Sequence, residues 1–279
     1  MKERIITVGK PIPLAGLLCE PDKLDSSKPA VIIFNSGIMH HIGTCRLSVK
    51  LARKLAEIGY SSIRFDFSGI GDSDARLGSL SFAESAPQEA AEIMNFLQKR
   101  RGISKFILFG LCSGADAAYE TALIDDRAIA ICQIDPYAYK TLTWYLIHYG
   151  SRMFKLGSWF RFAKRKTMTL VGSVNVSKKI EEIDEEFIEM PSYIREFPPK
   201  KEVEANLKKL LNRGVAMYSI FPRSSHFNHQ SQYANSMGLG VWESLLKIDY
   251  MPEAEHIIPE PECQKQVVNN ISDWVKRIS

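Results

Sequence analysis

The sequence has 279 residues, enough for one large α/β domain or for a compact core that carries an inserted segment. Apolar residues make up 45% and charged residues 24%, which excludes a fibrous repeat and long disordered tracts. The formal charge of +4 is small for this length, so no nucleic-acid partner is indicated.

Cysteine usage and the N-terminal sequence indicate the cellular compartment. The five cysteines are an odd number without Cys-x-x-Cys or Cys/His metal spacing, so we predict neither a disulfide framework nor a metal site. The N-terminal sequence MKERIITVGKPIP lacks the apolar core of a signal peptide, and no apolar run reaches the length of a membrane span. We therefore expect a cytoplasmic protein without an integral membrane segment.

Strands and helices alternate through the first half of the chain. Short apolar runs that end at glycine or polar residues predict buried parallel strands over 30–34, 61–67, 105–109 and 128–134. Apolar residues at helical spacing predict helices over 47–58, 83–100 and 115–124. This alternation predicts an α/β fold with a mostly parallel central sheet and helices on both faces.

Residues 139–201 interrupt the alternation. They carry aromatic, basic and then acidic helical stretches without strand signals, so we interpret them as a helical lid inserted into a core of residues 1–138 and 202–279. A basic run at 161–166 would meet an anionic carrier or a membrane surface, or would form a solvated helix face. The pattern then resumes with a helix over 203–212, strands over 214–220 and 245–250, and a closing helix over 264–278.

The strongest chemical signal is GLCSG at residues 110–114, which stands between a predicted strand and a predicted helix. A Gly-x-nucleophile-x-Gly elbow places the nucleophile at its middle position, which is Cys112 and not Ser113. A thiol at a helix N-terminus lies in positive potential, which favours the nucleophilic thiolate. The alternative is a small buried cysteine in a glycine-rich turn.

His256 is the predicted general base. It follows the last predicted strand and precedes the closing helix, so the nucleophile comes before the histidine in the chain, as the hydrolase triad requires. A lone histidine is more often an ordinary core or surface residue, but the other histidines lie in predicted loops or in the inserted segment and lack this position.

The third member of the triad is harder to assign. Residues 221–240, which follow the next strand, contain no Asp or Glu. Asp135 ends the preceding strand and is the candidate acid, although an Asp before a Pro also serves as a helix N-cap or a turn former. Asn228 or Ser225 are alternative partners for His256, because a thiolate and imidazolium pair needs less help than a serine does.

Two backbone N–H groups are candidates for an oxyanion hole. Ile38 lies in the loop that follows the first buried strand, and its N–H is expected opposite that of Ser113. A plain structural turn is the competing interpretation of this loop. The nearby SGIGDS at 68–73 lacks the lysine of a P-loop and the full Gly-x-Gly-x-x-Gly spacing, so we interpret it as a structural turn beside the site.

These stretches together resemble the α/β-hydrolase superfamily and, within it, the exosortase-system-associated hydrolases. The likeness covers the first half of the chain and includes Gly43, Arg46, Leu47, Arg53, Gly59, RFDFSGIGDS, the GLC elbow and a lid segment at 148–152. It implies an α/β-hydrolase core with Cys112 as nucleophile, His256 as base, and no metal or organic cofactor. The chain departs from that family at Ser113, where an acidic residue is common, and in the carboxylate-free segment after Ser219.

We therefore predict a cysteine-dependent acyl-transfer enzyme in which Cys112 attacks an ester or thioester carbonyl and His256 moves the proton. The acyl group would pass to water in a thioesterase or esterase, or to an amine, thiol or carbanion in an acyltransferase or condensing enzyme. We expect a small-molecule or carrier-bound acyl substrate, with an acyl carrier protein as a candidate partner. The alternatives are a binding protein with a degraded triad and a C–C hydrolase or lyase.

Aromatic side chains of the inserted segment indicate an apolar acyl or aromatic substrate. The candidate pocket residues there are Trp144, Tyr145, His148 and Trp159. Packing of the same side chains against the core is the alternative interpretation.

Overall fold

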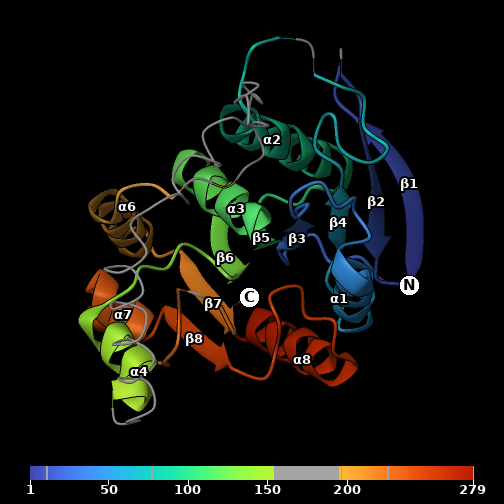
Figure 1. Cartoon of the computed structure of the whole chain (residues 1–279). Coiled ribbons are helices and arrows are strands. Elements are labelled where there is room, and N and C mark those ends of the chain that lie inside the picture. Colours follow the sequence, from blue (N-terminus) through green and yellow to red (C-terminus); the bar gives the residue numbers. More distant parts are fainter. Residues whose placement is uncertain (11, 77, 154–194, 196, 225, 279) are drawn as a thin grey trace, which may run out of the picture. The chain divides into compact units, whose positions relative to one another are not determined.

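The structure of the protein, a computed structural model, describes residues 1–10, 12–76, 78–153, 195, 197–224 and 226–278. Within these residues, eight strands form one sheet in the order β1-β2-β4-β3-β5-β6-β7-β8 (Figure 1). The strands are β1 (Lys2–Val8), β2 (Leu14–Glu20), β3 (Ala30–Ile33), β4 (Ser62–Phe65), β5 (Phe106–Leu111), β6 (Ala128–Ile134), β7 (Ala216–Pro222) and β8 (Leu246–Met251). Strand β2 is antiparallel to β1 and β4, and the remaining pairs are parallel, which confirms the predicted mostly parallel sheet.

Helices cover both faces of this sheet (Figure 1). The helices are α1 (Leu47–Glu57), α2 (Phe82–Arg101), α3 (Ser113–Ile124), α4 (Leu142–Met153), α6 (Lys200–Asn212), α7 (Gln232–Met237) and α8 (Pro261–Ile278), with 3-10 turns η1 (Thr44–Arg46) and η2 (Gly240–Trp242). Among the described residues, no helix combines the length and the apolar character needed to cross a membrane.

The two faces of the sheet explain why β3 is apolar throughout. Side chains alternate between faces along a strand, so Ile32 packs with α2, α3 and α6, whereas Val31 and Ile33 pack with α1 and α8. Both sides of β3 are therefore buried, and its sequence is an unbroken apolar run. This pattern identified the parallel strands.

The first two strands were not predicted. β1 lies at an edge of the sheet and pairs only with β2, and most of its side chains are exposed or half-buried. Because an edge strand of this kind needs few apolar residues, KERIITV carries a weak hydrophobic pattern. The other predicted strands and helices of the core are confirmed, with boundaries that shift by a few residues.

The chain divides into two compact units, Met1–Tyr139 with Ser192–Ser279, and Lys140–Pro191. Helix α4 belongs to the second unit, and helix α6 belongs to the first. The assignment of residues 139–201 as a lid stays a prediction.

Candidate active site

Cys112 lies at the junction of β5 and α3, in a strained backbone conformation. Its φ of 56° and ψ of −119° are rare for a residue with a side chain. The Cys112 N–H donates to the Ile134 carbonyl oxygen at 2.9 Å, and the Cys112 carbonyl accepts the N–H of Asp116 at 3.1 Å. The turn is thus held on one side by strand β6 and on the other by the first turn of α3.

The flanking glycines are required by close approaches of the backbone. A Cβ at Gly110 would lie 2.0 Å from the carbonyl oxygen of Gly114, and a Cβ at Gly114 would lie 2.2 Å from that of Asn35. No side chain fits at either position, because the neighbouring atoms belong to the backbone. The strand, the elbow and the loop after β3 therefore meet at van der Waals distance.

His256 lies in the loop after β8 and reaches two groups of the site. Its Nδ1 is 2.7 Å from Oδ2 of Asp135, and the side chain of Cys112 is near enough to raise the pKa of the imidazole. The loop is fixed by main-chain hydrogen bonds, since Ala254 accepts from the N–H of Arg223 at 2.9 Å and Glu255 accepts from that of Ile258 at 2.9 Å.

Asp135 lies directly after β6, at the carboxyl end of a strand next to the one that carries the elbow. Its φ of 51° is again positive, and its N–H donates to the Ile220 carbonyl oxygen at 2.8 Å. The side chain therefore turns from the strand end toward His256. The structure thus brings together Cys112, His256 and Asp135, the three residues that the sequence nominated.

The electrostatics of this group favour a charged imidazole. Hydrogen bonds to Asp135 and then Cys112, opposed by burial, raise the pKa of His256 to about 10. A histidine with that pKa carries a proton at neutral pH. The imidazolium is then paired with the Asp135 carboxylate through Nδ1 and interacts favourably with the side chain of Cys112.

Ser113 is connected to the loop after β3. Its hydroxyl oxygen accepts the N–H of Gly37 at 2.7 Å. That bond ties the first residue of α3 to the segment containing Ile38, whose side chain is exposed. The two amides nominated for the oxyanion hole therefore belong to segments that are bonded to each other, and the hydroxyl of Ser113 is committed to the loop.

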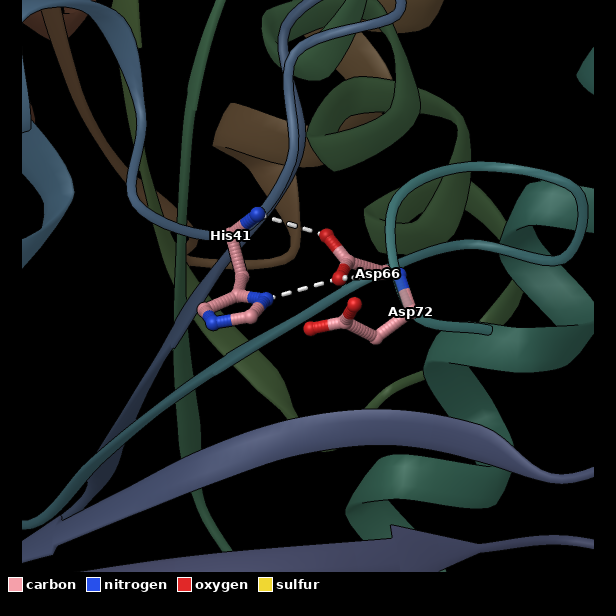
Figure 2. A group of neighbouring side chains, drawn as sticks. All are labelled: His41, Asp66 and Asp72. Atoms are coloured by element: carbon pink, nitrogen blue, oxygen red, sulfur yellow. Dashed lines mark hydrogen bonds and ion pairs between the residues drawn. The ribbon is translucent and has the colours of Figure 1, made fainter.

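A second histidine and carboxylate pair holds the same loop (Figure 2). Nδ1 of His41 lies 2.7 Å from Oδ2 of Asp66, which is fully buried. The Asp66 carboxylate also accepts N–H groups from the Asn35 amide at 2.9 Å, the His41 backbone at 2.5 Å and the Asp72 backbone at 3.1 Å. Burial raises the pKa of Asp66, but the hydrogen bonds from His41 and Asn35 outweigh it and lower the pKa below its usual range.

His41, Asp66 and Asp72 could be considered as ligands for a cation, because their donor atoms lie within 4.8 Å of one another. Both oxygens of Asp66 already accept two N–H groups each, so a cation would have to displace the bonds that fix the loop. We therefore assign this group a structural role, in line with the turn predicted at 68–73.

Arg195 is a site residue that the sequence did not reveal. Its Nε and Nη2 atoms bind the two oxygens of Asp116 at 2.6 and 2.8 Å, and its Nη1 lies 4.0 Å from Sγ of Cys112. Burial raises the pKa of the Asp116 carboxyl to about 6, against the opposing effect of Arg195. Burial lowers the pKa of Arg195, but Asp116 outweighs this and raises it. Asp116 follows Cys112 by one helical turn, which was the one available signal.

A cavity of about 350 Å³ opens beside these residues. Its lining combines the histidine and aspartate of the candidate triad with two arginines, a second histidine and an aromatic ring. The lining residues are Asp135, Pro136, Ala138, Arg195, Phe197, Arg223, Ser224, His226 and His256. The cavity therefore presents basic groups beside the candidate nucleophile.

The predicted pocket residues of the inserted segment are only partly described. On α4, the ring of Trp144 stacks on that of His148 at a centroid distance of 4.6 Å and contacts Tyr145 edge-on at 5.1 Å. Trp159 and Ser225 lie outside the described residues. A role for the α4 side chains in substrate binding stays a prediction.

No protein-family model matches the sequence, and no curated protein matches it. Solved structures do share its fold. The alpha/beta hydrolase GrgF from Penicillium sp. sh18 is 15% identical, with a TM-score of 0.60 and coverage of 99% of this chain and 98% of its own. A putative hydrolase from Agrobacterium vitis S4 is 15% identical, with a TM-score of 0.56 and coverage of 98% of both chains.

Alpha/beta hydrolase domain-containing protein 10 from mouse is 13% identical, with a TM-score of 0.56 and coverage of 100% of both chains. Likeness at such identities identifies the fold and not the reaction. The chain has the α/β-hydrolase fold, as predicted. Membership of the exosortase-associated group stays a prediction.

Proposed function

We propose that this protein is a cysteine-dependent acyl-transfer enzyme acting on an ester or thioester through an acyl-Cys112 intermediate. One observation carries the proposal: the thiol on a strained elbow raises the pKa of a neighbouring histidine whose Nδ1 lies 2.7 Å from a carboxylate oxygen. A nucleophile, a proton carrier and an orienting acid at these positions form the machinery of covalent acyl transfer.

The first step uses the charged form of His256. Paired with the imidazolium, the sulfur of Cys112 attacks the carbonyl carbon of the substrate as a thiolate. The S–C bond forms while the carbonyl π electrons move to oxygen. The N–H groups of Ile38 and Ser113 are the proposed donors to that oxyanion.

Collapse of the tetrahedral intermediate breaks the bond to the leaving group. His256 gives its proton to the departing thiolate or alkoxide and becomes neutral, leaving an acyl-Cys112 thioester. Neutral His256 then accepts a proton from the incoming water, amine or thiol, whose attack releases the acyl group and regenerates the thiolate. Asp135 keeps the imidazole oriented through both steps.

Hydrolysis and transfer are both compatible with this site. A thioester reacts more readily with amines and thiols than with water, so acyl transfer to an amine or thiol is as compatible with the site as hydrolysis. The positive φ of Cys112 argues against a mere binding protein, because such strain costs free energy and serves to present a nucleophile. A lyase or C–C hydrolase has no supporting residue.

Intact-mass analysis of wild type, Cys112→Ala and Ser113→Ala after exposure to a panel of acyl thioesters tests the proposal. Cys45→Ala is the matched control, since Cys45 is the exposed cysteine and reports ordinary thiol reactivity. We expect an acyl adduct in every protein except Cys112→Ala. Adducts on all four proteins, or on none with any acyl chain, would favour the non-catalytic reading.

A further inference from the structure

The guanidinium of Arg195 is clamped on three sides. Asp116 binds it through two parallel hydrogen bonds, and the rings of Tyr137 and Phe197 lie 5.0 and 4.8 Å from its central carbon. The side chains of Arg195 and Asp116 are only 14% and 11% exposed. A planar cation held by a bidentate carboxylate and by aromatic faces has little freedom to reorient.

The position of the clamp is set by the elbow itself. Asp116 lies in the first turn of α3, and its N–H donates to the carbonyl oxygen of Cys112. The same turn that presents the thiol therefore also places the carboxylate that holds Arg195. Burying the ion pair of Arg195 and Asp116 removes both charges from water, which costs free energy. Apolar residues of similar volume would stabilise the fold as well, so stability alone does not explain the pair.

One edge of the guanidinium remains for a ligand. Nε and Nη2 are occupied by Asp116, whereas the recorded contact of Nη1 among the described residues is the long one to Cys112 Sγ at 4.0 Å. Arg195 also lines the cavity, together with Arg223 and His226. Among the described residues that line the cavity, Asp135 is the only carboxylate, and it is paired with His256.

We propose that Arg195 is a specificity residue that selects acyl groups carrying a carboxylate close to the reacting carbonyl, as in a malonyl- or succinyl-type thioester. This inference rests on the proposed function, because it places the acyl group on Cys112. In an acyl-enzyme the carbonyl carbon is one bond from Sγ, so a carboxylate a few bonds farther along the acyl chain is within reach of an N–H group 4.0 Å from that sulfur. A charge-assisted hydrogen bond would form there without moving the clamp.

Alkylation by iodoacetate and iodoacetamide isolates this contact from acyl catalysis. Both reagents place a two-carbon unit on sulfur as iodide leaves, and they differ only in whether the terminal group is a carboxylate or an amide. The rate ratio of iodoacetate to iodoacetamide at Cys112, followed by peptide mass, is compared with the same ratio for glutathione. The variants are Arg195→Lys, the double variant Arg195→Met/Asp116→Asn, which leaves no unpaired buried carboxylate, and Arg223→Met as the matched control.

We expect the wild-type ratio to exceed that of glutathione by about 10-fold or more, the size of one hydrogen bond to a charged group. The double variant should lower the ratio by about that factor, to the value set by the remaining imidazolium of His256, and Arg195→Lys should lie between it and wild type. Arg223→Met should lower the ratio less, since Arg223 is 64% exposed. Equal ratios in wild type and the double variant, or equal losses in the Arg195 and Arg223 variants, would overturn the proposal. If Cys112 reacts no faster than Cys45 with either reagent, the proposed function fails while the ratio still decides the role of Arg195.

Discussion

The protein contains two histidine and aspartate pairs with the same distance between nitrogen and oxygen, and their surroundings differ. In each pair Nδ1 of the histidine lies 2.7 Å from a carboxylate oxygen. His41 is 9% exposed and its partner Asp66 is fully buried, whereas the side chain of His256 is 42% exposed and lines a cavity. The distance between the two side chains therefore does not distinguish a structural pair from a catalytic one.

What separates the pairs is the remaining hydrogen-bonding capacity. Asp66 accepts four N–H groups and fastens the loop after β3, so its carboxylate has no capacity left for a further donor. His256 lines the cavity, and the side chain of Cys112 is near enough to raise the pKa of its imidazole. We therefore propose that the Asp66 carboxylate contributes to stability and that the Asp135 carboxylate contributes to reactivity.

Replacing the histidines gives the largest expected contrast. His256→Gln should slow acyl-enzyme formation by about 1000-fold, because general acid–base catalysis contributes roughly 100- to 10,000-fold. His41→Gln should slow it by less than about 10-fold per folded molecule while lowering the free energy of unfolding by about 1–3 kcal/mol, the cost of an unmet buried hydrogen bond. Rapid-quench mass analysis and urea unfolding measure the two effects, and similar rates for both variants would contradict the division.

Replacing the carboxylates should affect stability more at Asp66 than at Asp135. Asp66→Ala leaves buried N–H donors unsatisfied and should lower the free energy of unfolding by about 3 kcal/mol or more. Asp135→Ala removes the main cause of the raised pKa of His256, whose side chain is 42% exposed, and should lower the free energy of unfolding by less than Asp66→Ala does. Urea unfolding measured on both variants decides this, and a larger loss for Asp135→Ala would show that the open pair is structural.

The pKa of His256 gives a prediction that depends on pH. Because it is raised from 6.5 to about 10, the protonated imidazole stabilises the fold in full below about pH 6.5, and that contribution is lost as the pH rises toward 10. NMR titration of labelled histidine should show His256 still protonated at pH 8. Asp135→Asn should lower its pKa most and Cys112→Ala should lower it less, and an ordinary midpoint in the wild-type protein would refute the charged pair.

Ser113→Ala should have the smallest effect. It removes the hydrogen bond in which the Gly37 N–H, in the loop after β3, donates to the Ser113 hydroxyl of the elbow. We expect a loss of about 1 kcal/mol in unfolding free energy and a decrease of less than about 10-fold in the acylation rate. Abolition of the acyl-enzyme by this variant would instead identify Ser113 as the nucleophile.

The sequence predicts the strands and helices that have a regular apolar pattern, and it predicts the candidate site residues that follow those strands. Apolar runs located the central strands, and the position of Cys112, Asp135 and His256 at strand ends followed from the strand order. Arg195 could not be found in this way, because it lies outside any periodic segment and reaches Asp116 only through the tertiary fold. His41 was set aside as a loop residue, and only the structure shows its bond to Asp66.

The most direct test of the central claim is pre-steady-state release of p-nitrophenolate from p-nitrophenyl acetate by wild type, Cys112→Ala and Cys45→Ala. Slow turnover of the thioester intermediate should produce a stoichiometric burst in wild type and in Cys45→Ala, and none in Cys112→Ala. A burst of equal size in Cys112→Ala would contradict the assignment of Cys112 as the acyl-carrying nucleophile.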